Sequence, residues 1–179
     1  MGETDKSEQY LTFLLNKDSY AFNVLKIREV LELVKITRVP RTPKFMAGVI
    51  NLRGRVVPVI DLRVKFDMEE TGNTIDTTII IVEVDYQEEI IIIGALVDSV
   101  KAVVRLEESQ LEPPPKIGMN LDLNFIDAIG KKSNDFIIIL NVDKIFSAKE
   151  LSFLVEGINK EEENKDLWGF WNLTGLLKL

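Results

Sequence analysis

Short apolar runs separated by polar turns follow one another along most of the chain. Runs at 10–15 and 20–23, on either side of a polar turn, have the composition of paired strands. Isoleucine-rich runs at 77–85 and 90–97 flank an acidic turn and predict a second hairpin. The remaining predicted strands are 49–53, 55–66, 97–106, 123–129 and 136–142. About ten short strands with little helix are typical of small barrels or of a sandwich.

Three short stretches have helical patterns instead. Apolar residues at helical spacing predict a helix over 24–31, with Glu29 on its polar face. A Thr-Pro pair predicts a helix start in 42–47, because threonine is a good cap and proline is tolerated in the first turn. A Ser-x-x-Glu capping box predicts a C-terminal helix over 147–156. The pattern as a whole therefore predicts a mainly β protein with short helices.

The strand-like segment 40–66 is interrupted by polar residues and glycines. Asn51, Arg53 and Gly54 separate two β-branched runs and predict a hairpin corner, with the glycine supplying the turn. Pro58 has no N–H to donate, which favours an edge strand or a bulge. An unpaired edge with polar groups at its corner fits a docking surface. A twisted hairpin with solvated charges is the alternative.

Two charged residues and a polar segment follow this hairpin. Asp61 and Arg63 are two residues apart, so on a strand both would point to the face opposite the apolar residues. We expect them to have a structural role and to hold the hairpin together. The polar segment 67–76, which contains Gly72 and Asn73, predicts a boundary or a mobile loop.

Composition narrows the class of protein. A chain of 179 residues can form one good-sized domain or two small packed ones, and 46% hydrophobic residues are enough for a core. The net charge of −7, from 22 basic and 29 acidic residues, argues against a nucleic-acid partner. The N-terminus has no apolar leader, and no run approaches the roughly 18 apolar residues of a membrane-spanning helix. We therefore expect a globular protein of the cytoplasm without direct membrane insertion.

The sequence offers little chemistry for catalysis. It contains no cysteine and no histidine, which excludes disulfides, thiolate nucleophiles and phosphorelay through a histidine of this chain. No two carboxylates have the spacing of an acid–base pair. Phosphate-loop, dinucleotide and calcium motifs are missing as well. We expect no catalytic residue, no metal and no cofactor, and hence no enzyme.

Several motifs occur together in a fixed order. They are Ile27-Arg28-Glu29-Val30, Thr42-Pro43-x-Phe45-x-x-Gly48, Asn51-Leu52-Arg53-Gly54, Val57-Pro58-Val59-Ile60-Asp61-Leu62-Arg63, Lys65-Phe66, Gly94-x-x-Val97-Asp98-x-Val100, Pro113-Pro114-Pro115 and Leu140-Asn141-Val142-x-Lys144-Ile145. On these residues the chain resembles the CheW-like coupling (adaptor) proteins of bacterial chemotaxis. The resemblance extends over roughly residues 8–155, and the ordered set is far more specific than any single motif.

The resemblance implies a fold of two five-stranded SH3-like barrels packed together. One subdomain would comprise about 24–75 with the C-terminal helix, and the other about 76–145 with the N-terminal strands. The implied function is that of a non-enzymatic adaptor, which links the cytoplasmic tips of chemoreceptors (methyl-accepting chemotaxis proteins) to the regulatory domain of the histidine kinase CheA. The implied place is the inner face of the membrane, at receptor arrays. No cofactor is implied.

The resemblance also implies a receptor-binding groove. Its residues would be Ile27, Glu29, Gly48, Arg53, Ile79 and Val100. The matching Glu29–Arg53 pair would be close in space beside the groove, with an ordinary surface ion pair as the alternative. For Gly48, the alternative is a role in backbone geometry. For the three apolar residues, the alternative is a place in the hydrophobic core. The hairpin and its turns would depend on Asn51, Leu52, Gly54, Pro58, Asp61 and Arg63.

Other interpretations remain open from the sequence. Within the same fold, the chain could be a CheV-like protein or a fragment of a kinase regulatory domain, although 157–179 is too short for the receiver domain that CheV needs. In another class, it could be a small β-barrel ligand carrier or enzyme. The segment 157–179 is charged and then aromatic, with both tryptophans in 167–177. It could anchor a partner or an oligomer, pack on its own domain, or be disordered.

Overall fold

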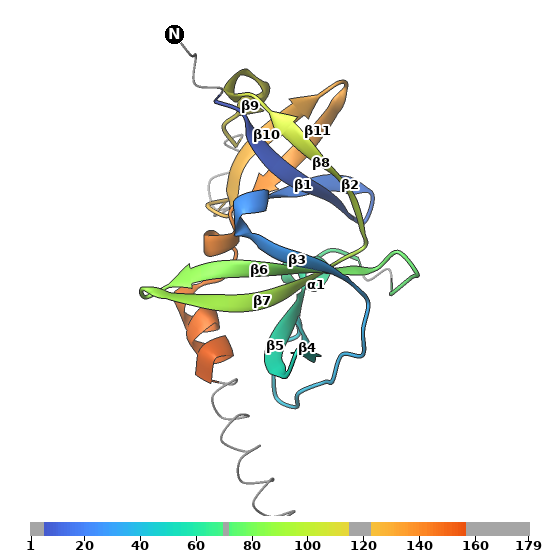
Figure 1. Cartoon of the computed structure of the whole chain (residues 1–179), viewed down its shortest axis with the longest axis vertical. Helices are drawn as coiled ribbons and strands as arrows, with labels where there is room; N and C mark the ends of the chain where they lie inside the picture. The colour runs from blue at the N-terminus through green and yellow to red at the C-terminus, as the bar shows by residue number, and fades with distance from the viewer. Residues whose placement is uncertain (1–5, 70–71, 115–122, 157–179) are drawn as a thin grey trace, which may run out of the picture. The chain divides into compact units, whose positions relative to one another are not determined.

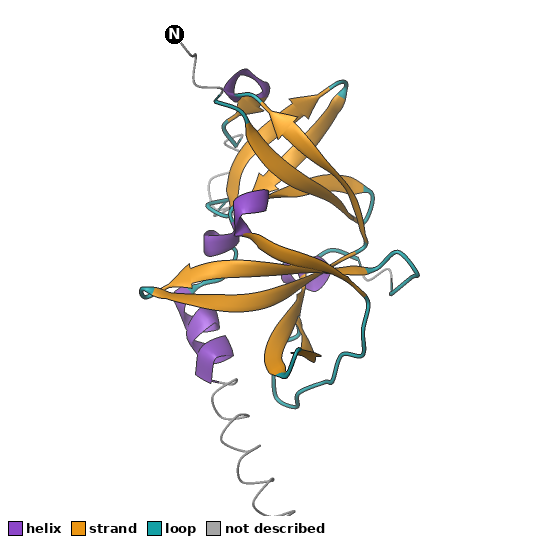
Figure 2. Ribbon diagram, viewed as in Figure 1, coloured by secondary structure: helices purple, strands orange, loops and turns teal. Residues whose placement is uncertain are grey.

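The computed structural model describes residues 6–69, 72–114 and 123–156. The chain divides into two compact units, Met1–Ile145 and Phe146–Leu179. The first unit contains both β-sheets (Figures 1 and 2). None of the helices in the described part of the chain is long and apolar enough to cross a membrane.

One sheet is built from the two ends of the first unit. Its strands are β1 (Glu8–Leu15), β2 (Asp18–Asn23), β8 (Ser99–Leu106), β9 (Leu111–Glu112), β10 (Ile126–Lys132) and β11 (Asp135–Leu140), in the order β8-β1-β2-β11-β10-β9. All neighbours are antiparallel except β2 and β11. Its core cluster comprises Tyr10, Ala21, Val104, Leu106, Ile137 and Ile139. We call this set of strands the first sheet.

The middle of the chain forms the second sheet. Its strands are β3 (Ile27–Glu32), β4 (Met46–Leu52), β5 (Arg55–Asp61), β6 (Thr78–Tyr86) and β7 (Glu89–Val97), in the order β3-β6-β7-β5-β4. Only β5 and β7 run parallel. Its core cluster comprises Ile50, Val57, Val59, Ile79, Ile81 and Leu96.

The second sheet is curled so that its outermost strands approach each other. Leu31 of β3 and Leu52 of β4 both pack on the same core cluster, although these strands stand at opposite ends of the strand order. The predicted mainly β fold of two SH3-like barrels is confirmed. The first sheet has six strands rather than the five predicted, because the two-residue β9 pairs with β10.

The strand pairing places the change of sheet later than the sequence analysis did. Strands β6 and β7, which were expected in the second subdomain, pair with β3 and β5 instead. The chain therefore leaves the second sheet at Val97 and enters the first at Ser99, not near residue 75. In the chain, the polar segment 67–76 comes between α1 and β6, and the strands before and after it, β5 and β6, belong to one sheet, so it is no boundary between the subdomains.

The predicted helix over 24–31 is wrong. A 3₁₀ turn, η1 (Val24–Lys26), is followed at once by β3, with the side chain of Asn23 accepting from the N–H of Leu25. Along β3 partly buried and exposed residues alternate strictly, and its backbone pairs with β6 from Ile27 to Glu32. A six-residue pattern fits either a helix or a strand, and hydrogen bonds to a neighbouring strand decided the outcome.

The predicted helix over 42–47 is also wrong. The Thr42 hydroxyl donates to the carbonyl of Val39 (2.9 Å) instead of capping a helix, and β4 already begins at Met46. The strand predicted over 55–66 ends at Asp61, whose side chain caps the short helix α1 (Leu62–Lys65) by accepting from the N–H of Arg63. Asp61 and Arg63 therefore do not share a strand face.

Pro58 does not mark an edge strand, because β5 lies between β4 and β7. Opposite it, Val49 exchanges both of its backbone hydrogen bonds with Thr37, at 2.8 Å each, so the Val49–Pro58 pair needs no hydrogen bond. Pairing with β7 begins only at the next residue, Val59. The missing N–H therefore costs no ladder hydrogen bond, and the outermost strand of this hairpin is β4.

The remaining hairpins follow the sequence pattern closely. Gln87 and Glu88, both with positive φ, form the turn between β6 and β7. Strands β10 and β11 pair as predicted around a shorter turn, with Ser133 at a φ of 57°.

In the second unit, helical residues 148–156 begin at the predicted capping box. The Glu150 side chain accepts from the N–H of Ser147 (3.0 Å), and Ser147 Oγ accepts from the N–H of Glu150 (3.1 Å), so this prediction is confirmed. The predictions for 157–179 and for Pro115 concern parts of the chain outside the described residues.

Candidate functional site

The predicted hairpin corner is a two-residue turn that presents Arg53. Leu52 and Arg55 form the last pair of the β4–β5 hairpin, and Arg53 (φ 51°) and Gly54 (φ 84°) form the turn between them. Positive φ at both central residues is the type I′ geometry that matches the twist of paired strands. Asn51 Oδ1 accepts from the N–H of Gly54 at 2.7 Å. Local hydrogen bonding and one glycine therefore fix where the Arg53 side chain starts.

Arg53 and Glu29 form a bidentate ion pair across the second sheet. Arg53 Nη1 donates to Glu29 Oε1 (2.7 Å) and Nη2 donates to Oε2 (3.0 Å). The hydrogen bonds and the charge of Glu29 raise the pKa of Arg53. The Arg53 side chain is 75% exposed and that of Glu29 only 25%. The pair thus joins β3 to the β4–β5 turn while most of the Arg53 side chain stays exposed to solvent.

Gly48 has a backbone role. Its φ is +150°, and a Cβ built there would lie 2.2 Å from the carbonyl oxygen of Thr37. Thr37 must approach this closely because it pairs with Val49 in an isolated bridge. That Gly48 also admits a receptor helix stays a prediction.

The three apolar residues predicted for the groove have different surroundings. Ile27 on β3 and Val100 on β8 are half-buried, and they belong to different sheets. Ile79 is fully buried in the core cluster of the second sheet, so it offers no surface to a partner. This corrects its expected place in the groove. Of the six groove residues, hydrogen bonds bring Glu29 and Arg53 together.

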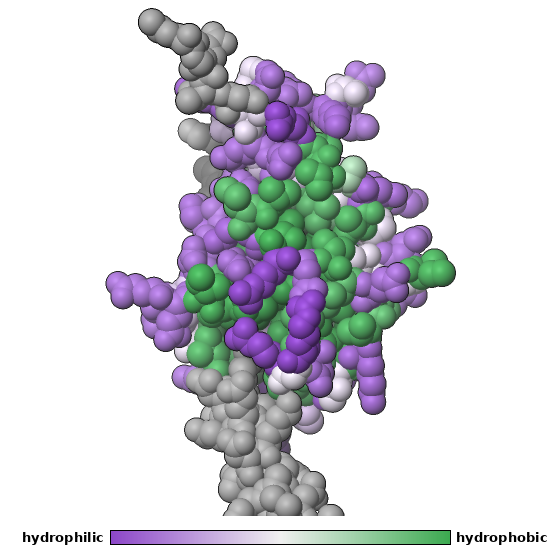
Figure 3. All heavy atoms as spheres, viewed as in Figure 1, coloured by the Kyte–Doolittle hydropathy of each residue, from purple (hydrophilic) through white to green (hydrophobic). Residues whose placement is uncertain are grey.

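Three exposed apolar residues in and just after β3 were not singled out from the sequence. Val30, Leu33 and Val34 are 43%, 36% and 45% exposed. On the face that Figure 3 shows, apolar side chains spread over the middle, across β1, β2 and β8. Strongly hydrophilic side chains lie at the level of β3 and β6. The sequence shows these residues as part of an apolar run, but the predicted helix over 24–31 covered only Val30, and nothing in the pattern distinguishes exposed from buried apolar residues.

Arg63 is a buried counterpart of Arg53. It is 3% exposed, and its Nε and Nη2 donate to the two carboxylate oxygens of Asp61 at 3.0 Å each. Its Nη1 donates to Asp98 Oδ1 (2.8 Å) and to the carbonyl of Gly72 (2.9 Å). Burial lowers the pKa of Arg63, but the hydrogen bonds and charges of Asp61 and Asp98 outweigh it and raise the pKa overall. The predicted structural role of Arg63 thus extends well beyond the hairpin.

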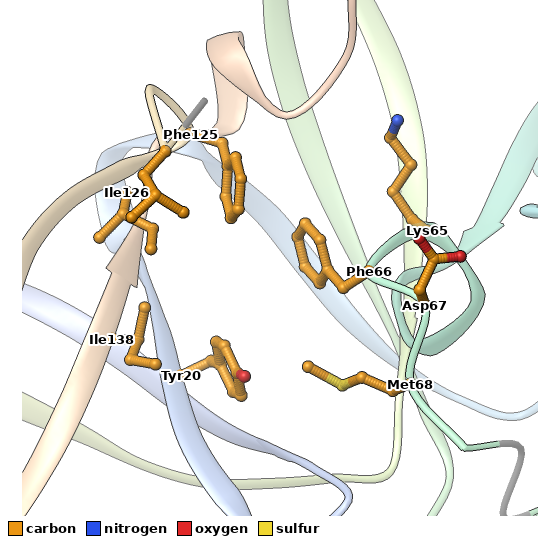
Figure 4. A pocket seen from close by; sticks show the side chains of 9 residues that line it. Tyr20, Lys65, Phe66, Asp67, Met68, Phe125, Ile126 and Ile138 are labelled. Carbon is orange, nitrogen blue, oxygen red and sulfur yellow. The ribbon is translucent and has the colours of Figure 1, made fainter. Parts of the chain in front are cut away.

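An apolar pocket of about 400 Å³ lies between β2, β11 and the residues after α1 (Figure 4). Its lining residues are Tyr20, Lys65, Phe66, Asp67, Met68, Leu123, Phe125, Ile126 and Ile138. The rings of Phe66 and Phe125 stack with centroids 5.2 Å apart. Sequence reasoning missed this pocket, because its residues come from four distant segments that only tertiary pairing assembles. It holds no pair of carboxylates suited to acid–base chemistry.

No group of three or more metal-binding side chains is found among the described residues. The family model described as "CheW-like domain" matches residues 9–150 of this chain.

The chain belongs to the CheW-like domain family.

Known proteins agree with this assignment. The chemotaxis protein CheW of Klebsiella aerogenes is 31% identical over 159 residues, which cover 89% of this chain and 92% of that protein. The chemotaxis protein CheW of Bacillus subtilis is 34% identical, with 80% and 90% covered. The crystal structure of the scaffolding protein TtCheW from Thermoanaerobacter tengcongensis has a TM-score of 0.71 and 34% identity, and covers 80% of this chain and 94% of that chain. The CheW-like domain is thus a member of a chemotaxis scaffold family.

Proposed function

We propose that this CheW-like domain is a non-enzymatic adaptor that couples chemoreceptor tips to the histidine kinase CheA. Membership in a chemotaxis scaffold family supports the class of function. The adaptor would work in the cytoplasm, at receptor arrays on the inner face of the membrane. One barrel would meet a barrel of the kinase regulatory domain, the other barrel would meet a second one, and the groove between them would take the receptor tip.

The observation that carries the receptor side of this proposal is the Glu29–Arg53 pair. An ion pair this exposed contributes little to stability, so holding the hairpin is a weak reason for it. A bidentate carboxylate does, however, fix the plane of the guanidinium, and five N–H donors in a fixed fork suit a polar partner. Val30 of β3 and Leu33 and Val34 just after it are exposed apolar residues, which would bury against aliphatic side chains of a receptor hairpin.

Calorimetric titration tests the proposal directly. The full chain is titrated with the isolated regulatory domain of a CheA kinase from the same source, and separately with a receptor tip fragment. Both titrations are repeated with Arg53→Ala and with Arg55→Ala, an exposed arginine of the same hairpin, as the matched control. We expect saturable one-to-one kinase binding in all three proteins and loss of receptor binding in Arg53→Ala alone. Absence of kinase binding would contradict the adaptor function and favour the ligand-carrier alternative.

A further inference from the structure

Where the chain passes from β7 of the second sheet to β8 of the first sheet, the connection is a single residue, Asp98. Strand β7 of the second sheet ends at Val97, and β8 of the first sheet begins at Ser99. A one-residue connection leaves almost no slack, so the backbone angles of Asp98 directly affect how the two barrels are oriented. Hinges in proteins are often a few residues of this kind, at the ends of regular elements.

The Asp98 side chain bonds to both sides of this connection. Its Oδ1 accepts from Arg63 Nη1 at 2.8 Å, and Arg63 lies in α1 directly after β5 of the second sheet. Its Oδ2 accepts from the backbone N–H of Asn16 at 2.6 Å, in the turn between β1 and β2 of the first sheet. The N–H of Asp98 itself donates to the carbonyl of Leu14 (3.1 Å). One carboxylate therefore bridges the two barrels at the point where the chain crosses.

Arg63 is firmly held on its own side. Besides both oxygens of Asp61, it bonds to the carbonyl of Gly72 and to Asn73 Oδ1 (3.1 Å), so helix α1 and the loop before β6 meet at one buried guanidinium. A buried charge is costly without its partners, and a rigid bidentate fork restricts the directions they can take. Asp98 therefore receives a directional contact from a rigid part of the second barrel.

The turn on the other side depends on Asp98. Asn16 has a φ of 55°, and its Oδ1 is buried with no hydrogen-bond partner among the described residues. Its side chain therefore does not stabilise the turn through this oxygen, whereas its N–H is held by the carboxylate of Asp98. The position of the β1–β2 turn is thus linked to the same group that holds Arg63.

Further contacts join the same barrels, and they differ in kind. The backbone N–H of Asp85 donates to Asp143 Oδ1 at 2.8 Å. Lys26 Nζ bonds to Asp85 of β6 (3.0 Å) and to Asp143 of η3 (Val142–Lys144) at 2.9 Å, with 67% of the Asp85 side chain exposed. Phe66 stacks on Phe125. The polar contacts of Lys26 and Asp143 are more exposed to solvent, with side chains 25% and 34% exposed, and the stacked rings contain no hydrogen bond. The bridge through Asp98 differs from these contacts, because it includes the buried guanidinium of Arg63, although 21% of the Asp98 side chain is exposed.

We propose that Arg63 and Asp98 are positioning residues that set the orientation of the two barrels, and that this rigid bridge transmits a receptor-side change to the kinase side. Only the second part of this inference, the transmission between partners, rests on the proposed adaptor function. Allosteric coupling requires that binding at one site biases an element that the other site also contacts. The angle between the barrels is such an element, because it would change the spacing between β3 and β8, which carry the predicted groove residues.

The orientation is measured first, without any partner. The chain has no cysteine, so the variants Glu88→Cys and Lys132→Cys introduce one spin label into an exposed turn or strand end of each barrel. Pulsed electron spin measurements then give the distribution of distances between the labels. In Asp98→Asn, which keeps the size and an acceptor oxygen but removes the charge, we expect this distribution to broaden about two-fold. Lys26→Met, the matched control, should keep the narrow distribution.

The coupling is measured next, in the full complex with kinase and receptor fragment. We expect Asp98→Asn to bind each partner separately as the parent does, while receptor-dependent activation of the kinase falls about ten-fold. A folded Asp98→Asn with an unchanged distance distribution would overturn the proposal. If this variant does not fold, Arg63→Lys, which keeps the charge but loses the fork, takes its place. Unfolding of both variants would overturn it too, because the bridge would then serve folding alone.

The two measurements separate this inference from the proposed function. A broadened distance distribution in a protein that binds no kinase would support the bridge and refute the adaptor. A narrow distribution in a protein that binds both partners would support the adaptor and refute the bridge.

Discussion

Arg53 and Arg63 lie in the same segment of the chain and both form bidentate pairs with a carboxylate, yet their environments are opposite. The Arg53 side chain is 75% exposed in a hairpin turn, whereas the Arg63 side chain is 4% exposed. The same pair of groups therefore has two different consequences. At the surface it orients a group toward solvent, and in the interior it holds separate elements in register, because only a buried charge strictly requires its partners.

The largest expected effect tests the buried member of this comparison. Arg63→Ala leaves Asp61 and Asp98 without their main cationic partner, so the free energy of unfolding should fall by about 3–5 kcal/mol. Denaturant unfolding followed by circular dichroism measures the change. A loss below about 1 kcal/mol would mean that the interior pair is no more important than a surface pair.

A smaller loss is expected at Gly48, in the hairpin that carries Arg53. Gly48→Ala brings a Cβ to within 2.2 Å of the Thr37 carbonyl, so β4 must shift, at a cost of about 1–3 kcal/mol. Gly54→Ala is the matched control, because a Cβ there meets nothing within 4 Å and only the φ of +84° is strained. In thermal unfolding, the midpoint of Gly48→Ala should be lower than that of Gly54→Ala. The reverse order would contradict a steric role for Gly48.

The exposed member of the comparison should barely affect stability. For Arg53→Ala we expect an unfolding midpoint equal to that of the parent, together with receptor binding weakened about ten-fold or more. Denaturant unfolding and calorimetry on the same preparation give both values. A clear fall in the midpoint would show that Arg53 closes the barrel rather than positions a partner.

The smallest effect separates charge from geometry. Arg53→Lys keeps the positive charge but cannot form the planar fork with Glu29, so we expect receptor binding between that of the parent and that of Arg53→Ala. Calorimetry with the receptor fragment resolves the three values. Full binding by the lysine variant would mean that charge alone is recognised.

Part of the site could be predicted from sequence, and the reason differs from residue to residue. The hairpin corner at Asn51, Arg53 and Gly54 follows from local turn chemistry, which needs no tertiary information. The proximity of Glu29 and Arg53 came from family resemblance, because a separation of 24 residues carries no geometric signal. The place of Ile79 could not be decided, because an apolar strand residue has the same pattern in a core and in a groove.

By itself, the sequence determined most of the strands, the hairpin turn at Arg53 and Gly54, the capping box at Ser147 and the family, and its lack of histidine and cysteine ruled out much chemistry. These properties depend on residue type and near neighbours. Only the tertiary structure decided the strand order, the conversion of 24–31 into a 3₁₀ turn and β3, and the bridge from Arg63 through Asp98 to Asn16. These depend on hydrogen bonds and packing between residues far apart in the chain, which no local pattern encodes.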